Sequence, residues 1–175
     1  MIKMIKATEN NLDDLMKLRL EMLKEINHLP EEYSFSSLFL DDSQQYFMSG
    51  QHTTVLATED GAAVGCATLC YTEMLPTFSH PTGKRAHMMN VYTKKEYRCQ
   101  GLATTMLFML IEQAKEMGVT EITLDATEQG GSLYQKFGFT ESREGMVLDL
   151  KLLLQKNIDR VEKYGCQTHS CCTCH

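Results

Sequence analysis

Residues 98–103 read Arg-Cys-Gln-Gly-Leu-Ala and stand directly before a strongly amphipathic segment. Gly101 and Ala103 are small, so a ligand can approach the backbone closely there. The first turn of a helix leaves N–H groups unpaired, and the helix dipole adds partial positive charge at the same end. This combination favours binding of an anion, above all a pyrophosphate, with added charge from Arg98 and a hydroxyl from Thr104.

Other phosphate-binding loops fit this segment less well. A Walker loop requires Gly-Lys followed by Ser or Thr, which the chain lacks. A dinucleotide-binding fingerprint requires a third small residue within a parallel βαβ unit, whereas here two small residues follow a strand of a predicted hairpin. Taken alone, the loop is equally compatible with an ordinary helix start.

A second segment about thirty residues further on, residues 133–139, reads Leu-Tyr-Gln-Lys-Phe-Gly-Phe. Residues 91–103 resemble the cofactor motif of the GNAT superfamily of N-acetyltransferases, Arg/Gln-x-x-Gly-x-Gly/Ala, and residues 133–139 resemble the Leu-Tyr-x-Lys-x-Gly-Phe segment of that family. The two motifs stand at the expected separation, and the resemblance extends over most of the chain up to Leu150.

The resemblance implies an acetyltransferase with acetyl-CoA as the acyl-donor cosubstrate. It implies that the backbone of residues 98–104 binds the pyrophosphate. It also implies that Val91 and Thr93 pair with the pantetheine arm, in a gap opened by a strand bulge, and that Tyr134 lies near the sulfur of CoA. The expected cofactor-binding residues are Val91, Tyr92, Thr93, Arg98, Cys99, Gln100, Gly101, Leu102, Ala103, Thr104, Thr127 and Tyr134.

Two positions depart from the family pattern. Thr127 stands seven residues before the tyrosine, where the family often has an asparagine that contacts pantetheine. Three residues later the usual alanine is Gly130, followed by Gly131, which favours a looser start of the short helix.

Acyl transfer to an amine needs a neutral amine and a thiolate that can leave. A free alkylamine has a pKa near ~10.4, so neutralising it at pH 7 costs roughly 4.6 kcal/mol, which a base or a desolvated pocket must supply. Tyr134 is a predicted catalytic residue, because its hydroxyl would stabilise the developing thiolate by a hydrogen bond. The alternative is that Tyr134 packs in the core beside Phe137 and Phe139.

His87 is the predicted catalytic base. It lies eleven residues before Arg98 on the preceding strand, where histone-acetylating relatives carry a catalytic glutamate. An imidazole suits proton transfer near neutral pH. The alternative is a polar residue near a strand end. Asn90 and Asp125 could line the same cleft.

The elements that must position these residues follow the order β-α-α-β-β-β-α-β-α-β-β. Strands are predicted over residues 1–7, 53–58, 63–71, 86–93 and 120–126, with a final hairpin that includes residues 146–150. Helices are predicted from residue 10 or 11 to Pro30, and over residues 35–48, 101–117 and 132–137. This order predicts an α/β fold with a mixed, mostly antiparallel central sheet flanked by helices on both faces. The predicted organisation is an acetyltransferase domain over residues 1–150, a helical extension over residues 151–164 and a Cys/His-rich tail over residues 165–175.

Composition and net charge limit the kinds of binding partner that we expect for this protein. A formal net charge of −6 and a pI near 5.5 disfavour a nucleic-acid binder. No apolar run reaches the roughly 20 residues that span a bilayer, and the first residues are too short a run for a signal peptide. We therefore expect a cytoplasmic protein that acts on acetyl-CoA and a primary amine of a small molecule or peptide, with a homodimer left open and no membrane or nucleic-acid partner.

The tail contains four cysteines and two histidines in residues 165–175. Thiolates and imidazoles together suit zinc or Cu(I), but the spacing matches no zinc-finger pattern, so no metal site is predicted. Two alternatives to an enzyme remain. One is a non-catalytic module of the same fold that binds or senses acyl-CoA, and the other is a metal-binding protein that acts through the tail.

Overall fold

The computed structural model describes residues 1–127 and 130–141. The predicted strand at 146–150, the extension at 151–164 and the tail at 165–175 lie outside the described residues. The proposed boundaries between domain, extension and tail therefore stay predictions.

The described elements follow the predicted order. β1 (Ile2–Lys6) precedes two helices, α1 (Leu12–Ile26) and α2 (Ser37–Met48), with a 3-10 turn, η1 (Glu9–Asn11), before α1. Three strands come next: β2 (His52–Glu59), β3 (Ala62–Glu73) and β4 (Lys84–Thr93). A second 3-10 turn, η2 (Lys95–Tyr97), leads to α3 (Leu102–Glu116), β5 (Glu121–Leu124) and the short α4 (Gly131–Lys136).

The five strands form one sheet in the order β1-β2-β3-β4-β5. Neighbours from β1 to β4 are antiparallel, and β5 runs parallel to β4 because α3 forms the crossover between them. The turn between β2 and β3 is as tight as predicted, since Asp60 and Gly61 both have positive φ angles of 49° and 87°. The mixed, mostly antiparallel sheet is thus confirmed.

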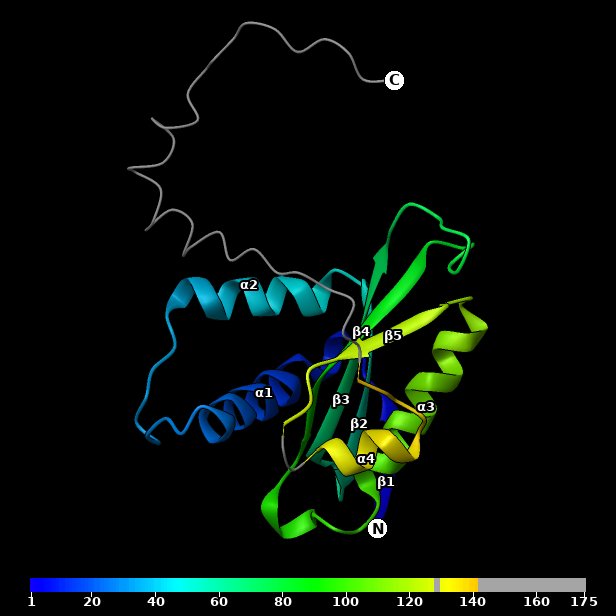
Figure 1. Cartoon of the computed structure of the whole chain (residues 1–175). Helices are drawn as coiled ribbons and strands as arrows, with labels where there is room; N and C mark the ends of the chain where they lie inside the picture. The colour runs from blue at the N-terminus through cyan, green and yellow to red at the C-terminus, as the bar shows by residue number, and fades with distance from the viewer. Residues whose placement is uncertain (128–129, 142–175) are drawn as a thin grey trace, which may run out of the picture. The chain divides into compact units, whose positions relative to one another are not determined.

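Helices cover both faces of this sheet, with α1 and α2 on one side and α3 on the other (Figure 1). On the α1 side, Leu15 and Leu18 pack against Leu56 and Cys66. On the opposite side, the buried stripe of α3 consists of Leu102, Met106, Leu107, Leu110 and Ala114. Each fully buried leucine contributes roughly 1.5–3 kcal/mol, so these two cores hold the strands in a fixed register.

Some element boundaries differ from the prediction for local reasons. The second helix begins at Ser37 instead of Phe35, because Ser36 is its N-cap and its Oγ accepts a hydrogen bond from the Phe39 N–H at 3.3 Å. β5 ends at Leu124, two residues earlier than predicted. Across residues 1–127 and 130–141, no helix combines the length and the apolarity needed to cross a bilayer.

Candidate active site

The edges of β4 and β5 separate part of the way along their length. The two strands pair over four positions, from Arg85 opposite Glu121 to Met88 opposite Leu124. Beyond Met88, β4 continues to Thr93 while β5 has ended. Within the described part of the chain, β5 therefore leaves the end of β4 without a partner on that side, and an extended ligand can pair with its peptide groups.

A bulge distorts β4 at the same place. The β3–β4 register shifts between Cys66 and Thr68, and Asn90 adopts a positive φ of 57°. The Asn90 side chain is 5% exposed, and its Nδ2 donates to Sγ of Cys66 at 3.4 Å. The Cys66 thiol in turn donates to the Asn90 carbonyl at 3.2 Å. These two contacts stabilise the bulge from inside the core.

Two buried polar atoms at this bulge make no hydrogen bond with another described residue. Among the described residues, Oδ1 of Asn90 and Oγ of Thr93 are buried without a hydrogen-bond partner. Buried polar atoms are nearly always paired in native proteins, so an unpaired pair beside a free strand edge suits a group with its own amide donors. The pantetheine arm of CoA is such a group.

Gly65 of β3 keeps the bulge in place because the backbone of β4 at Tyr92 approaches Gly65 closely. A Cβ atom at this position would lie 2.9 Å from the carbonyl oxygen of Tyr92 and 3.4 Å from Cε of Met106. Gly65→Ala should therefore displace β4 at Tyr92, lower the free energy of unfolding by about 1–3 kcal/mol and weaken acetyl-CoA binding. Denaturant unfolding and equilibrium binding measure both effects. The control is Gly131→Ala, where the new Cβ meets nothing within 4 Å, and equal behaviour of the two variants would contradict the prediction.

The loop before α3 uses two left-handed residues, Cys99 with φ 60° and Gly101 with φ 79°. Gly101 is the N-cap of α3, and its carbonyl accepts the first intrahelical bond from the Thr105 N–H at 3.0 Å. The N–H groups of residues 102–104 precede that bond and face out of the helix end. Successive N–H groups in such a turn can form a concave anion site, which is the role that the sequence predicts for this loop.

Gly101→Val should remove this anion site without a steric clash, since nothing lies within 4 Å of the new Cβ. The φ of 79° is strained for valine, so the loop backbone should rearrange. Acetyl-CoA at 100 times its Kd stabilises a protein by about 2.7 kcal/mol, and we expect that rise in melting temperature to disappear in the variant. Gly118→Val is the matched control. It lies at the other end of α3 with φ 74° and equally open space, and it should keep the shift. Retention of the full shift by Gly101→Val would move the phosphate site elsewhere.

The charge of Arg98 is paired inside the protein, which differs from the expectation that it serves the phosphate. Its Nη2 lies 2.7 Å and 2.8 Å from the two carboxylate oxygens of Glu25 on α1. Its Nε donates to the Thr93 carbonyl at 2.9 Å, and the guanidinium lies 5.8 Å from the Tyr92 ring centroid. Arg98 thus ties the end of β4 to α1, which leaves the backbone N–H groups at the start of α3 as the donors predicted for a phosphate.

The other predicted cofactor-binding residues gather along this strand end and loop. Tyr92 directs its side chain towards α1, where its hydroxyl donates to Glu25 at 3.4 Å. Burial is the main cause that raises the pKa of Tyr92. The remaining ones are Val91 and Ala103, which are half-buried, Leu102, which is buried, and Cys99, Gln100 and Thr104, which are exposed.

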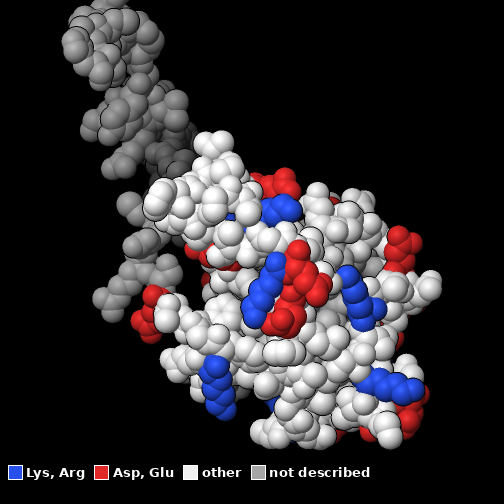
Figure 2. Space-filling view, turned by 90° about the vertical axis from the view of Figure 1, so that its right-hand side faces the viewer, with Lys and Arg blue, Asp and Glu red and all other residues white. Residues whose placement is uncertain are grey.

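Charges of both signs are mixed on the side of the molecule that carries α3, so surface charge does not replace the backbone N–H groups as donors to an anion. Figure 2 looks onto the side that carries α3, and the Lys, Arg, Asp and Glu side chains coloured there are interspersed. On α3 itself, Lys115 and Glu112 pair at 2.6 Å. Over the described ranges, no group of three His, Cys, Asp or Glu side chains is arranged to hold a metal ion.

Tyr134 lies in α4, and its ring packs against Gly130. A Cβ at Gly130 would come within 3.1 Å of Cε2 of Tyr134 and 3.3 Å of Oγ of Thr127, so any larger residue here would have to displace these side chains slightly. Thr127 forms the turn that begins α4, because its Oγ and its carbonyl both accept from the Gly130 N–H, at 3.3 Å and 3.0 Å. Burial raises the pKa of Tyr134, which keeps its hydroxyl protonated and a hydrogen-bond donor at neutral pH.

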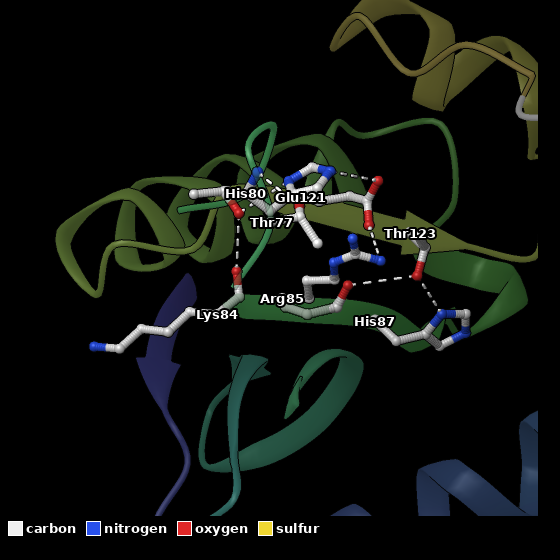
Figure 3. A network of polar contacts seen from close by, with 9 residues as sticks. Thr77, His80, Lys84, Arg85, His87, Glu121 and Thr123 are labelled. Carbon is white, nitrogen blue, oxygen red and sulfur yellow. Dashed lines mark hydrogen bonds and ion pairs between the residues drawn. The ribbon is translucent and has the colours of Figure 1, made fainter. Parts of the chain in front are cut away.

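His87 lies in a polar network at the start of β4 (Figure 3). Its Nδ1 is 2.8 Å from Oγ of Thr123, and its Nε2 is 3.8 Å from Oδ2 of Asp125. The Thr123 hydroxyl donates to the Ala86 carbonyl at 3.5 Å. When the Thr123 hydroxyl donates to Ala86, its oxygen is an acceptor for Nδ1–H of His87, and in that tautomer of the neutral imidazole the lone pair is on Nε2.

The face on which His87 lies follows from strand register. His87 is opposite Cys70 in the β3–β4 ladder, and residues directly opposite share a face of the sheet. Side chains alternate along β3, so Cys66, Thr68 and Cys70 share one face of the sheet. Cys66 packs against α1. His87 therefore points to the α1–α2 side and is 36% exposed. Sequence reasoning missed Thr123, although its two-residue spacing from Asp125 places both on one face of a strand.

The chain matches a family model, and its fold is similar to that of solved structures. Residues 20–139 match the model of the acetyltransferase (GNAT) family. A predicted acetyltransferase from Clostridium acetobutylicum, crystallised with acetyl-CoA, is 24% identical with a TM-score of 0.77, covering 87% of this chain and 98% of that one. A GCN5-related N-acetyltransferase from Ralstonia eutropha is 21% identical with a TM-score of 0.68, covering 86% and 99%.

A third similar structure is glucosamine-6-phosphate N-acetyltransferase from Arabidopsis thaliana, 17% identical with a TM-score of 0.64, covering 85% of this chain and 98% of that one. At these identities the structural neighbours show the fold, and the family model, which matches more than half of the chain, shows the family. The chain belongs to the acetyltransferase (GNAT) family of enzymes.

Proposed function

We propose that this enzyme transfers the acetyl group of acetyl-CoA to a primary amine of a small molecule or peptide, by direct attack in a ternary complex. The supporting observation is that the free edge of β4 follows directly on the strand segment that carries His87. A donor on that edge and an acceptor beside His87 would meet at the bulge. Alignment of two reactants in one complex can contribute several kcal/mol to the rate.

The donor would be held by backbone contacts along its length. Its pyrophosphate would accept from the N–H groups at the start of α3, and its pantetheine would extend the sheet beside Val91 and Thr93. Because Thr127 uses its hydroxyl in the α4 turn, we expect the backbone to provide most of the pantetheine contacts. The thioester would then lie at the bulge, between the two catalytic side chains.

His87 would accept the amine proton. The Thr123 contact orients the ring so that the free lone pair is on Nε2, and the exposed Asp125 carboxylate near Nε2 would stabilise the imidazolium that forms. Neutralising an ordinary amine at pH 7 costs roughly 4.6 kcal/mol, so a base positioned to accept the amine proton can have a large effect on the rate.

Tyr134 would stabilise the leaving thiolate. For an ordinary tyrosine, full proton transfer to a thiolate is uphill by roughly 2 kcal/mol. The raised pKa of Tyr134 makes that transfer still less favourable. A hydrogen bond donated to the developing charge is therefore the role that we propose for it.

Release of free thiol from acetyl-CoA in the presence of a panel of primary amines tests the proposal. We expect release that depends on the amine and yields the acetylated amine in equal amount. If acetyl-CoA raises the melting temperature but no amine is acetylated, the protein is instead a binding module that senses acyl-CoA.

A further inference from the structure

Arg19 of α1 is a half-buried cation that the fold leaves without a counter-charge. Its guanidinium carbon lies 5.5 Å from the ring centroid of Phe39 on α2. Within residues 1–127 and 130–141, no carboxylate comes within 4.0 Å of it and no hydrogen-bond acceptor reaches it. The Glu25 carboxylate on the same helix is bonded to Arg98 instead.

Two side chains of β3 that lie near Arg19 are neutral. They are the thiols of Cys66 and Cys70. Burial raises the pKa of Cys66 to about 12 and also raises the pKa of Cys70, so both stay protonated at neutral pH. Burial in turn lowers the pKa of Arg19. A desolvated cation without a partner is costly, and a bound anion would remove that cost.

The position of Arg19 relates it to the proposed acceptor site. Cys70 is directly opposite His87 in the β3–β4 ladder, which places their Cβ atoms about 5 Å apart on the same face. Cys66 contacts Asn90 at the bulge. Arg19 therefore lies on the α1–α2 side, over the stretch of sheet that leads from the candidate base to the bulge.

We propose that Arg19 binds a carboxylate of the acceptor, so that the acceptor is an amine that also carries an acidic group, such as an amino acid or a peptide with a free carboxylate. This inference rests on the proposed function. A planar guanidinium binds a carboxylate through two parallel hydrogen bonds. The guanidinium carbon lies 5.5 Å from the Phe39 ring centroid, a contact that uses the charge of Arg19 but none of its N–H donors.

Three sets of primary amines, matched in chain length and ending in a carboxylate, an amide or a phosphate, test this proposal. With the full-length enzyme we expect kcat/KM for the carboxylates to exceed that for the amides by at least ten-fold, mainly through KM. Arg19→Met keeps an apolar stem and should abolish this preference, whereas Arg19→Lys should retain part of it. Lys17→Met, on the exposed side of α1, is the control and should keep the full preference.

A second measurement does not depend on turnover: the rise in melting temperature that each amine gives to the CoA-bound enzyme. Equal treatment of carboxylate and amide, a stronger preference for phosphate, or a preference that survives Arg19→Met would overturn the proposal while acetyl transfer stands. If no amine is acetylated but the carboxylates alone stabilise the wild type and not Arg19→Met, the carboxylate site is supported and the transferase function is contradicted. If neither signal appears, both fail.

Discussion

Replacing His87 with glutamine is expected to lower kcat/KM for the best amine by ~10²–10⁴-fold, the range typical for loss of a general base. Glutamine still offers a side-chain amide near Oγ of Thr123, so the strand and its network should persist. The rate should fall because nothing then accepts the amine proton, while acetyl-CoA binding should change little. Steady-state kinetics and the acetyl-CoA-induced rise in melting temperature measure the two effects.

A second histidine variant distinguishes a base from a structural residue. His80→Gln is the matched control, since His80 also contacts a threonine and a carboxylate, with Nδ1 3.1 Å from Oγ of Thr120 and Nε2 3.6 Å from Glu121. It should keep kcat/KM near the wild-type value. Equal kcat/KM in His87→Gln and His80→Gln would remove His87 from the mechanism.

Tyr134→Phe is expected to lower kcat by ten- to a thousand-fold, as for one lost hydrogen bond to a developing charge. Phenylalanine keeps the ring that packs against Gly130, so folding should be preserved. The lost hydroxyl would act only as the thiolate forms, and therefore the Kd for acetyl-CoA should change little. Rapid-mixing or steady-state kinetics with a saturating amine give kcat, and calorimetry gives the Kd.

The raised pKa of Tyr134 gives the direction of the expected pH dependence of kcat. Burial shifts ionisation of its hydroxyl above the ordinary value near ~10, so the donor stays protonated as the pH rises to that value. Loss of kcat from ionisation of Tyr134 should therefore occur at a higher pH than it would for an ordinary tyrosine. Tyr71→Phe is the control, because it removes a tyrosine hydroxyl that makes a part-buried hydrogen bond, to Thr53 at 2.8 Å. A fall in melting temperature with kcat preserved in Tyr134→Phe would restore a packing role.

Local sequence signals predicted most of the fold. The period of apolar residues in α3, the Asp60-Gly61 turn and the stop at Gly118 each depend on neighbours a few residues away, and each was confirmed. The glycine loop and the tyrosine segment carry their information in the same local way. They were sufficient to predict the family and the order of elements.

Contacts between segments that are distant in the sequence decided which side chains of the site pair with one another. Arg98 and Glu25 are 73 positions apart, and a sequence alone cannot show that the charge expected for a phosphate is already paired. His87 and Thr123 meet across 36 positions, and their contact depends on the parallel register of β4 and β5. A register shift of one residue would turn His87 to the other face, so the pairing depends on the packed cores.

The sequence by itself thus determined the described elements, their order and the acetyltransferase family, because helix and strand periods, turn residues and motifs are local properties of the chain. The tertiary structure decided where β4 loses its partner, that His87 meets Thr123 and that Arg19 lacks a counter-charge among the described residues. These features arise from strand register and from burial, which depend on residues that are distant in sequence and become neighbours only when the sheet and its helices have packed.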